Sequence, residues 1–347
     1  MILNIIFGGL SKTPLFPGEM RRAGLFKNKR VVIAGGAGFV GSNLINRLLS
    51  EGATIKATVH KKSPQIINSK IDYVRGDLTK GDFCRKIVRG ADYVFMCAAN
   101  TSGAAVIEKT PLVHVTGNII MNSLMLEAAY EAKAKKFLFI SSNTVYPVTN
   151  HPVRESEMMN GEPFFKYFPV AWMKRYSEIL CEIYATKIKD PMNVVVVRPA
   201  NLYGPYDDFA WETSHVVPAL VRKVIERHNP IEVWGDGRDV KDLMYVDDFI
   251  EGVMLVVTKL KKFKPLNIGT GIPVSVRDVL KILIEVENFD DAKIVFDKTK
   301  PTMIKKRLID VSLARRLVGF KSNTTLREGL QKTVEWYKQN GNFKNSF

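Results

Sequence analysis

Residues 30–41, RVVIAGGAGFVG, decide the fold of this chain. The part at 31–34 is a short apolar run of the kind that forms a parallel strand covered on both faces. Glycines follow at once, and after them leucines at positions 44, 48 and 49 mark one face of a helix. A strand, a glycine turn and a helix in this order predict the start of an α/β domain with a parallel sheet.

The three glycines have the spacing G-x-x-G-x-x-G, and each position has a physical reason. Gly35 permits the sharp turn, Gly38 lets the backbone approach a diphosphate, and Gly41 allows close packing of the helix on the strand. The helix then begins at Phe39 and Val40, where free N–H groups and a partial positive charge face the phosphates. This context predicts a dinucleotide-binding site.

The rest of the chain extends the α/β pattern. Further apolar runs lie at 55–59, 73–74, 93–96, 137–140 and 194–197, and a long helix is predicted over roughly 112–132. They predict a Rossmann-type, doubly wound parallel sheet over residues 30–205. Beyond Pro205, helical stretches near 216–228, 247–260, 274–286 and 324–338 alternate with runs at 231–234, 266–268 and 293–296. These predict a smaller α+β domain, mainly 206–347, on the carboxyl edge of the sheet, where ligands bind in such folds.

Composition restricts the class of protein. Of the 347 residues, 46% are hydrophobic and 25% charged, as in ordinary globular enzymes. No apolar run approaches the ~18 residues of a membrane span, so none is expected. Residues 1–29 show little periodicity and are expected to be an extension that docks on the protein or on a second subunit. Contact with a membrane surface is the alternative for this segment.

The charge, the cysteines and the histidines of the chain limit which ligands, metals and partners are expected. The net charge of +16 favours anionic partners, but the basic residues are scattered and form no recognised nucleic-acid module. A diphosphate ligand and a generally basic surface therefore explain the charge without nucleic acid. The three cysteines have no CxxC spacing, which indicates reduced thiols in a cytoplasmic protein. The five histidines do not pair at metal-ligand spacing, so no metal is predicted.

The end of the second strand bears on the choice of dinucleotide. NAD sites usually place an Asp or Glu there, on the ribose hydroxyls. Here the strand ends in Val59-His60-Lys61-Lys62, which has no acid and suits a 2′-phosphate. NADP is therefore favoured over NAD, with a solvated basic turn as the alternative. After the fourth strand, Ala98 and Ala99 are small enough for the chain to pass closely under the cofactor.

Five motifs together carry a family resemblance. The glycine motif, Gly76-Asp77-Leu78, SNTVYP at 142–147, RPANLYGP at 198–205 and YVDD at 245–248 occur in the order of the extended short-chain dehydrogenase/reductase family. The resemblance covers about residues 30–340 and implies an NAD(P)-dependent enzyme acting on a nucleotide sugar, with a chain that crosses between its two domains. It implies cofactor contacts from Asp77, on the adenine, and from Leu78, Ala98, Ala99, Lys174, Pro199 and Leu202.

Within that family, NLYGPYDDF at 201–209 and SHVVPAL at 214–220 are most similar to the GDP-fucose synthase-like enzymes. The resemblance implies substrate contacts from a set of polar and aromatic residues: Asn143, Asn201, Val216, Lys223, Trp234, Lys241 and Lys300. Trp234 is either a stacking partner for the base or a core residue at a strand end. Lys241 stands where the family usually has Arg, and Thr302-Met303 stand where the group has Asp-Gly, which leaves the base and the sugar open.

The family's hydride chemistry uses a Ser or Thr, a Tyr, and a Lys four residues after the Tyr on one helix. Ser142 and Lys174 match the first and third of these. Val170 occupies the tyrosine position, and a valine can neither donate nor accept a proton. Tyr167 precedes Pro169, which is well placed as the first helical residue, so Tyr167 belongs to the loop ahead. It either replaces the missing base or only packs and contacts substrate.

Two further positions restrict the reactions that the resemblance implies. Dehydratases of the family carry an Asp-Glu pair where this chain has Asn143 and Thr144, so the resemblance excludes 4,6-dehydration. The GDP-fucose synthase-like enzymes use a Cys at the place of Thr144 and a His at the place of His215 for 3,5-epimerisation. Because only the His is kept, a single proton step at His215, or none, is expected. A purely structural His is the alternative.

Three functional hypotheses remain open. The first is reversible hydride transfer at C4 of a GDP-hexose or GDP-heptose. The second is a UDP-hexose 4-epimerase. The third, which Val170 makes credible, is a non-catalytic dinucleotide-binding protein. The resemblance also implies a homodimer in which helices near 112–132 and 170–188 form a four-helix bundle, with the N-terminal extension adding contacts toward a tetramer.

Overall fold

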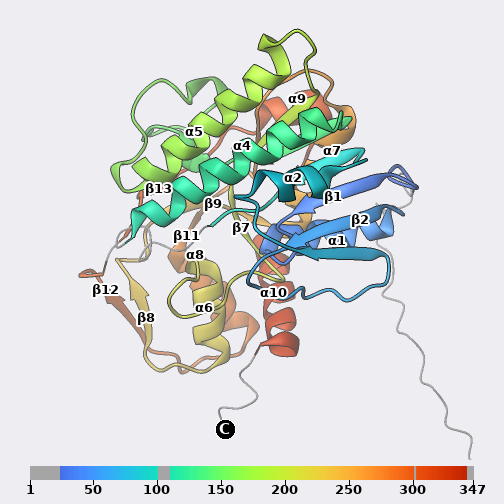
Figure 1. Cartoon of the computed structure of the whole chain (residues 1–347). Helices are drawn as coiled ribbons and strands as arrows, with labels where there is room; N and C mark the ends of the chain where they lie inside the picture. The colour runs from blue at the N-terminus through green and yellow to red at the C-terminus, as the bar shows by residue number, and fades with distance from the viewer. Residues whose placement is uncertain (1–23, 101–109, 301, 342–347) are drawn as a thin grey trace, which may run out of the picture.

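A computed structural model describes residues 24–100, 110–300 and 302–341 of the chain. A large sheet with helices on both faces adjoins a smaller α+β unit (Figure 1). All neighbouring strands of the seven-stranded sheet are parallel. Their spatial order is β10 (Leu266–Ile268), β6 (Val194–Pro199), β5 (Lys136–Ile140), β4 (Tyr93–Met96), β1 (Arg30–Ala34), β2 (Thr54–Val59) and β3 (Ile71–Arg75). This order, in which β1 lies between β4 and β2, confirms the doubly wound Rossmann-type sheet.

Each face of the sheet has its own hydrophobic core. On one face lie α1 (Phe39–Ser50) and α7 (Val246–Lys259), which pack against each other. On the other lie α2 (Gly81–Val88), α4 (Thr116–Glu131) and α5 (Phe168–Glu182). Because the strands are covered on both faces, they read as continuous apolar runs in the sequence rather than as alternating ones. Short α9 (Ser312–Val318) packs against α7 and β10.

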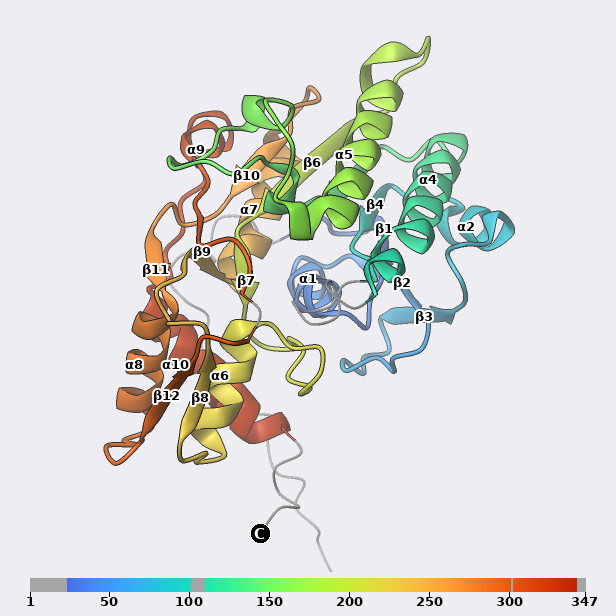
Figure 2. The ribbon, with the colours of Figure 1, turned by 90° about the vertical axis from the view of Figure 1, so that its left-hand side faces the viewer.

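The smaller unit holds two short sheets and three helices. In one sheet β11 (Pro273–Ser275), β9 (Val240–Tyr245) and β13 (Lys306–Arg307) are neighbours, and β7 (Asn201–Tyr203) also pairs with β9. In the other, β12 (Ile294–Asp297) pairs with β8 (Ile231–Trp234). The helices α6 (Val216–Ile225), α8 (Val276–Val286) and α10 (Leu326–Asn340) pack on one another (Figure 2). Their apolar faces form a third core.

One expected assignment is wrong. The run 266–268, grouped above with the smaller unit, forms β10 at the edge of the large sheet, where Leu266 pairs with Val197. The preceding helix α7 packs on α1 and so returns the chain to the first sheet. A three-residue apolar run has the same appearance in either sheet, and only the pairing partner decides between them.

Short 3₁₀ helices connect the main elements around the sheet. They are η2 (Pro111–His114), η3 (Asn143–Val145), η4 (Glu155–Glu157) and η5 (Phe165–Tyr167), and α5 continues into a π-helical turn, η6 (Ile183–Lys187). Helix α5 begins at Phe168, with Pro169 in its first turn, where the missing N–H costs nothing.

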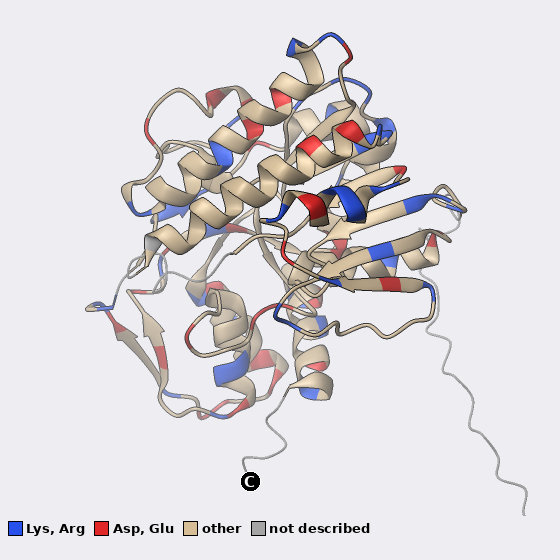
Figure 3. Ribbon diagram, in the orientation of Figure 1, with Lys and Arg blue, Asp and Glu red and all other residues tan. Residues whose placement is uncertain are grey.

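Most of the predicted N-terminal extension, 1–23, lies outside the described residues. Within its described part, Phe26 is buried in the core, with its ring centroid 5.0 Å from that of Tyr93. Lys and Arg are spread over both units and are interspersed with Asp and Glu (Figure 3). Across the described ranges, none of the helices combines the length and apolar character needed to cross a bilayer.

Candidate active site

The glycine turn between β1 and α1 is closed on two sides and open on one. Gly35 has φ +86°, and a Cβ there would lie 2.7 Å from the Cα of Ala98. A Cβ on Gly41 would lie 2.1 Å from the carbonyl oxygen of Gly35, so neither position accepts a side chain. At Gly38 a Cβ would meet only the Gly35 carbonyl, at 3.4 Å. The turn is thus packed against the sheet and open at Gly38, where a ligand approaches.

This cradle fits the diphosphate of a dinucleotide. Helix α1 begins after Gly38 without a side-chain cap and without an acidic residue in its first turn. Its first N–H groups are therefore available to an anion, and the helix dipole favours negative charge there. The residues Phe39 and Val40 at this end of the helix are half-buried.

Other predicted cofactor residues lie at the same carboxyl edge of the sheet. His60 and Lys61 are exposed at the end of β2. The Asp77 carboxylate accepts hydrogen bonds from the Thr79 backbone N (2.9 Å) and Oγ1 (2.8 Å), which lower the pKa of Asp77. Leu78 is buried, Ala98 is half-buried and Ala99 is exposed.

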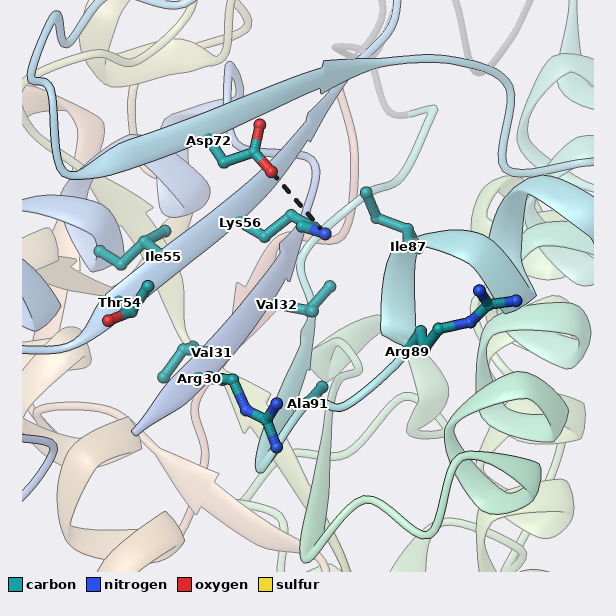
Figure 4. A pocket seen from close by; sticks show the side chains of 10 residues that line it. All are labelled: Arg30, Val31, Val32, Thr54, Ile55, Lys56, Asp72, Ile87, Arg89 and Ala91. Atoms are coloured by element: carbon teal, nitrogen blue, oxygen red, sulfur yellow. Dashed lines mark ion pairs between the residues drawn. The ribbon is translucent and has the colours of Figure 1, made fainter. Parts of the chain in front are cut away.

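A pocket of about 130 Å³ lies elsewhere, at the amino end of the sheet (Figure 4). It is lined in part by Arg30 and Thr54, the first residues of β1 and β2, and by Lys56, whose Nζ is 3.7 Å from an Asp72 oxygen. Because ligands of doubly wound folds bind at the carboxyl edge, this pocket is not part of the candidate site.

The segment after β5 brings polar side chains to that carboxyl edge. Ser142 Oγ accepts hydrogen bonds from the Thr144 backbone N (3.1 Å) and Oγ1 (2.9 Å). Asn143 Nδ2 donates to the Pro199 carbonyl (3.0 Å) and to Asn201 Oδ1 (3.4 Å), beyond β6. Asn143 therefore links the two neighbouring strand ends by hydrogen bonds, and Ser142 and Thr144 are paired beside it.

Lys174 projects from α5 toward the ends of β4 and β5. Its Nζ donates to the Ile140 carbonyl (2.8 Å) and lies 4.7 Å from the centroid of the Phe139 ring. Burial lowers the pKa of Lys174 to about 8, and nearby Glu178 opposes this shift. Val170, one turn earlier on the helix, is 9% exposed and offers no polar group.

A buried charge network, absent from the predictions, supports this region. Arg198 and Glu178 are each 2% exposed, and the guanidinium donates three hydrogen bonds of 2.5–3.1 Å to the carboxylate. Glu178 also accepts from the Ser141 hydroxyl. Arg198 further donates to the Tyr146 hydroxyl (2.8 Å), which donates in turn to Asn267 Oδ1 (2.5 Å). A Glu one turn after Lys174 and an Arg at the end of a buried strand were the available sequence signals.

Tyr167 lies in η5 and is the residue that caps the start of α5. Its ring makes an edge contact with Phe164, with centroids 5.5 Å apart. Burial raises the pKa of Tyr167 to about 12, with smaller effects from Arg307 and Asp239. The phenol is thus influenced by charges of the smaller unit.

Two buried cations lie side by side in that unit. Lys241 on β9 and Arg307 on β13 are register partners and are 8% and 3% exposed. The Arg307 Nη atoms donate to the carbonyls of Pro147 (2.9 Å) and Tyr146 (3.1 Å), while its buried Nε has no hydrogen-bond partner. Lys241 donates to the Ile304 carbonyl, and burial lowers the pKa of Lys241 to about 8.

The acid nearest this cation pair is Asp239, whose Oδ2 is 3.9 Å from Lys241 Nζ. Two buried positive charges with one acid beside them and one unused donor form an arrangement that an anion completes. Arg307 is not among the predicted substrate residues, and its burial distinguishes it from the exposed cations Lys300 and Lys306.

The remaining predicted site residues lie on the smaller unit. His215 is the N-cap residue of α6 and is exposed. Val216 and Trp234 are 37% and 42% exposed, so Trp234 is not a core residue. Lys223 Nζ donates to the Glu232 carbonyl (2.7 Å). Lys300 is exposed and Leu202 is half-buried in β7.

No group of three or more His, Cys, Asp or Glu side chains suited to a metal ion occurs within residues 24–100, 110–300 and 302–341. The three cysteines are free, and burial raises the pKa of Cys97 to about 12.

Comparison with known proteins gives consistent matches. The model of the "NAD dependent epimerase/dehydratase family" matches residues 31–269. The GDP-L-fucose synthase of Sinorhizobium fredii is 29% identical over 327 residues, which cover 91% of this chain and 98% of that protein. The GDP-mannose 3,5-epimerase 1 of Oryza sativa subsp. japonica is 30% identical over 318 residues, with coverage of 89% and 82%.

Solved structures show the same architecture. The UDP-glucose 4-epimerase of Thermotoga maritima, determined with UDP-glucose, superposes with a TM-score of 0.81 at 26% identity. The superposition covers 89% of this chain and 99% of that one.

Proposed function

Because the chain belongs to the NAD dependent epimerase/dehydratase family, we propose that it catalyses reversible hydride transfer at C4 of a GDP-hexose or GDP-heptose, with NADP preferred over NAD. The net reaction is 4-ketoreduction, 4-oxidation or epimerisation through a transient ketone. It is not 4,6-dehydration, because Asn143 and Thr144 offer no carboxyl group to protonate a leaving hydroxyl.

The buried pair Lys241 and Arg307 is the observation that carries this proposal. Burying two cations near a single acid is unfavourable unless an anion completes their hydrogen bonds. A nucleoside diphosphate supplies that negative charge beside the pair. Trp234, exposed at the end of β8, is available to stack on the base.

The residues around the β5 and β6 ends then act on the sugar. When bound at the glycine turn, the dinucleotide supplies the hydride donor or acceptor. The Ser142 hydroxyl, already paired with Thr144, orients the C4 hydroxyl by hydrogen bonding. The Asn143–Asn201 pair holds the substrate beside the diphosphate. His215 is the residue for any proton exchange at a neighbouring carbon.

Specific observations favour each of two nucleotides. The named sequence relatives act on GDP-sugars at 29–30% identity. The superposed Thermotoga enzyme contains UDP-glucose, which keeps a UDP-hexose 4-epimerase as the second candidate. The basic end of β2, with His60 and Lys61 exposed and no acid, favours NADP.

The test is absorbance at 340 nm with GDP-mannose-type sugars and their 4-keto forms, each with NAD(H) and NADP(H), and with UDP-sugars as controls. A change with one GDP-sugar and one cofactor supports the proposal and names both ligands. Turnover of UDP-sugars alone replaces it with the second candidate.

An epimerase that recycles its cofactor gives no net absorbance change, so sugar products are also analysed chromatographically. If neither assay detects turnover while the dinucleotide binds, the third hypothesis applies, a non-catalytic binding protein in which Val170 has ended the chemistry.

The proposal includes a homodimer through α4 and α5. Ile120 on α4 and Tyr176 and Ile179 on α5 are 38%, 49% and 40% exposed, and Ile183 just beyond α5 is 39% exposed. Large apolar side chains on the outer faces of adjacent helices favour burial against a second copy. Light scattering after size exclusion tests this, and a mass of two chains is expected, whereas four would implicate the N-terminal extension.

A further inference from the structure

The proposed hydride transfer needs a group that exchanges a proton with the C4 hydroxyl, and the position of the family's tyrosine is Val170. Tyr146 cannot serve, because its hydroxyl is fully buried and bonded to both Arg198 and Asn267. Burial also raises the pKa of Tyr146 well above its ordinary value.

The lysine of the family scheme is not among the charges that influence Tyr167. In the family chemistry a lysine makes the phenol acidic, but the charges that influence Tyr167 are those of Arg307 and Asp239. Its raised pKa of about 12 leaves the phenol protonated near neutral pH. The charges that influence Tyr167 are thus those beside the Lys241–Arg307 pair, whereas Lys174 is influenced by Glu178, Cys181 and Cys97.

We propose that the Lys174 amine itself takes and returns the proton of the sugar C4 hydroxyl. This inference rests on the proposed function. The amine projects from the helix face that carries Val170, and its anchor is the carbonyl of Ile140, two residues before Ser142. Ser142, whose hydroxyl is proposed to orient the sugar, follows that carbonyl by two residues at the same strand end.

Among the described residues, no group that faces the amine is a fixed ionic partner. From β5 it meets the Phe139 ring and the Ile140 carbonyl. From the end of β4 it meets Cys97, whose thiol stays protonated because burial raises its pKa to about 12. From its own helix it meets Glu178 and Cys181. The Cys181 thiol is also protonated, because burial raises its pKa.

Glu178, the one carboxylate in this set, is committed elsewhere. It accepts three hydrogen bonds from Arg198 and one from Ser141, so its charge is largely neutralised by the guanidinium. Desolvation consequently dominates at Lys174 and brings its pKa to about 8. About half of the amines are then unprotonated at pH 8, which suits a general base.

The step balances in both directions. In oxidation the sugar O–H bond breaks as an Nζ–H bond forms on the neutral amine. The C4–H electron pair leaves as hydride for the oxidised nicotinamide, which the proposed function supplies, and C4=O forms. In reduction the ammonium returns the proton to the C4 oxygen as hydride arrives.

The first experiment measures the amine directly. Lysine labelled with ¹⁵N at Nζ is titrated by NMR in the ligand-free protein, with Lys174→Arg to assign the signal. Half-titration near pH 8 is expected. A midpoint at the ordinary lysine value of about 10.4 overturns the proposal.

The second experiment measures single-turnover sugar oxidation against pH at saturating cofactor, with cofactor affinity measured separately. The rate should rise to a plateau with the NMR midpoint. Lys174→Ala and Lys174→Met should lower it by roughly 10²–10⁴-fold, and added ethylamine should partly restore Lys174→Ala. Lys187→Ala, at the exposed end beyond the same helix, is the matched control.

Two outcomes separate the possible failures. If Tyr167→Phe removes the pH midpoint while Lys174→Ala changes only cofactor affinity, another group exchanges the proton and the Lys174 assignment is refuted. If no sugar is turned over by any variant, the proposed function fails. The NMR titration still decides whether the amine has the proton affinity that the assignment requires.

Discussion

Removing the Arg198 guanidinium should destabilise the protein more than any ordinary single substitution. In Arg198→Met the methionine fills part of the space, but the Glu178 carboxylate loses three hydrogen bonds of 2.5–3.1 Å and its neutralising charge. It remains 2% exposed, with the Ser141 hydroxyl as a hydrogen-bond partner. Leaving one member of a buried ion pair unpaired costs about 3–5 kcal/mol of unfolding free energy.

This loss of unfolding free energy corresponds to a decrease in the melting temperature, Tm. An unfolding entropy of about 2.1 cal/mol/K per residue gives about 0.7 kcal/mol/K for 347 residues. The expected loss therefore lowers Tm by roughly 4–7 °C in calorimetry of the ligand-free protein. The double variant Glu178→Leu/Arg198→Met should recover much of it, because no charge is then left buried.

A second readout links this pair to the proton-exchanging amine. Without Arg198, the Glu178 charge is free to act on Lys174, one turn earlier on α5, and should raise the pKa of Lys174 above about 8. A fall in Tm of less than about 1.5 °C, together with an unmoved Lys174 titration, would refute the view that Arg198 neutralises Glu178.

The other predictions concern the ligand sites. Gly41→Ala should abolish dinucleotide binding, measured by fluorescence of the reduced cofactor, because its Cβ would lie 2.1 Å from the Gly35 carbonyl; Gly117→Ala, where nothing lies within 4 Å, should bind normally. Affinity for GDP, measured by calorimetry, should fall on the order of tenfold from pH 7 to 9, because Lys241 is charged below its pKa of about 8 and neutral above it. Lys241→Arg should remove that dependence, since a guanidinium stays charged; an equal fall in both proteins would contradict it. Lys61→Glu should reduce the preference for NADPH over NADH roughly tenfold in direct binding. An unchanged preference would show that the basic turn is a solvated surface and does not bind the 2′-phosphate.

The cofactor cradle was predictable because its determinants are local. The positions of Gly35, Gly38 and Gly41 relative to one strand and one helix are fixed by twelve consecutive residues, 30–41. The parallel sheet follows from the same logic, since buried strands and covering helices each have a characteristic pattern and length. The resemblance added Ser142, Asn143 and Asn201. The fold joins the Asn143 and Asn201 side chains by a hydrogen bond across two strand ends, while the Ser142 hydroxyl accepts hydrogen bonds from Thr144.

The charge balance of the site was not predictable, because it depends on residues that are distant in sequence. Lys241 and Arg307 become neighbours only when β9 and β13 pair. The pattern of charges alone does not distinguish buried Arg307 from exposed Lys300. Nor does it show that Tyr167 lies near Arg307.

The sequence by itself determined the kind of sheet, the glycine cradle and the absence of a phenol at Val170, since each is a property of a short segment or a single position. Only the tertiary structure decided that β10 belongs to the large sheet and that the Arg198 guanidinium neutralises the Glu178 carboxylate. It also decided that the pKa of Lys174 falls to about 8. Pairing, burial and desolvation arise from atoms that many residues bring to one place, and no segment of the chain contains them alone.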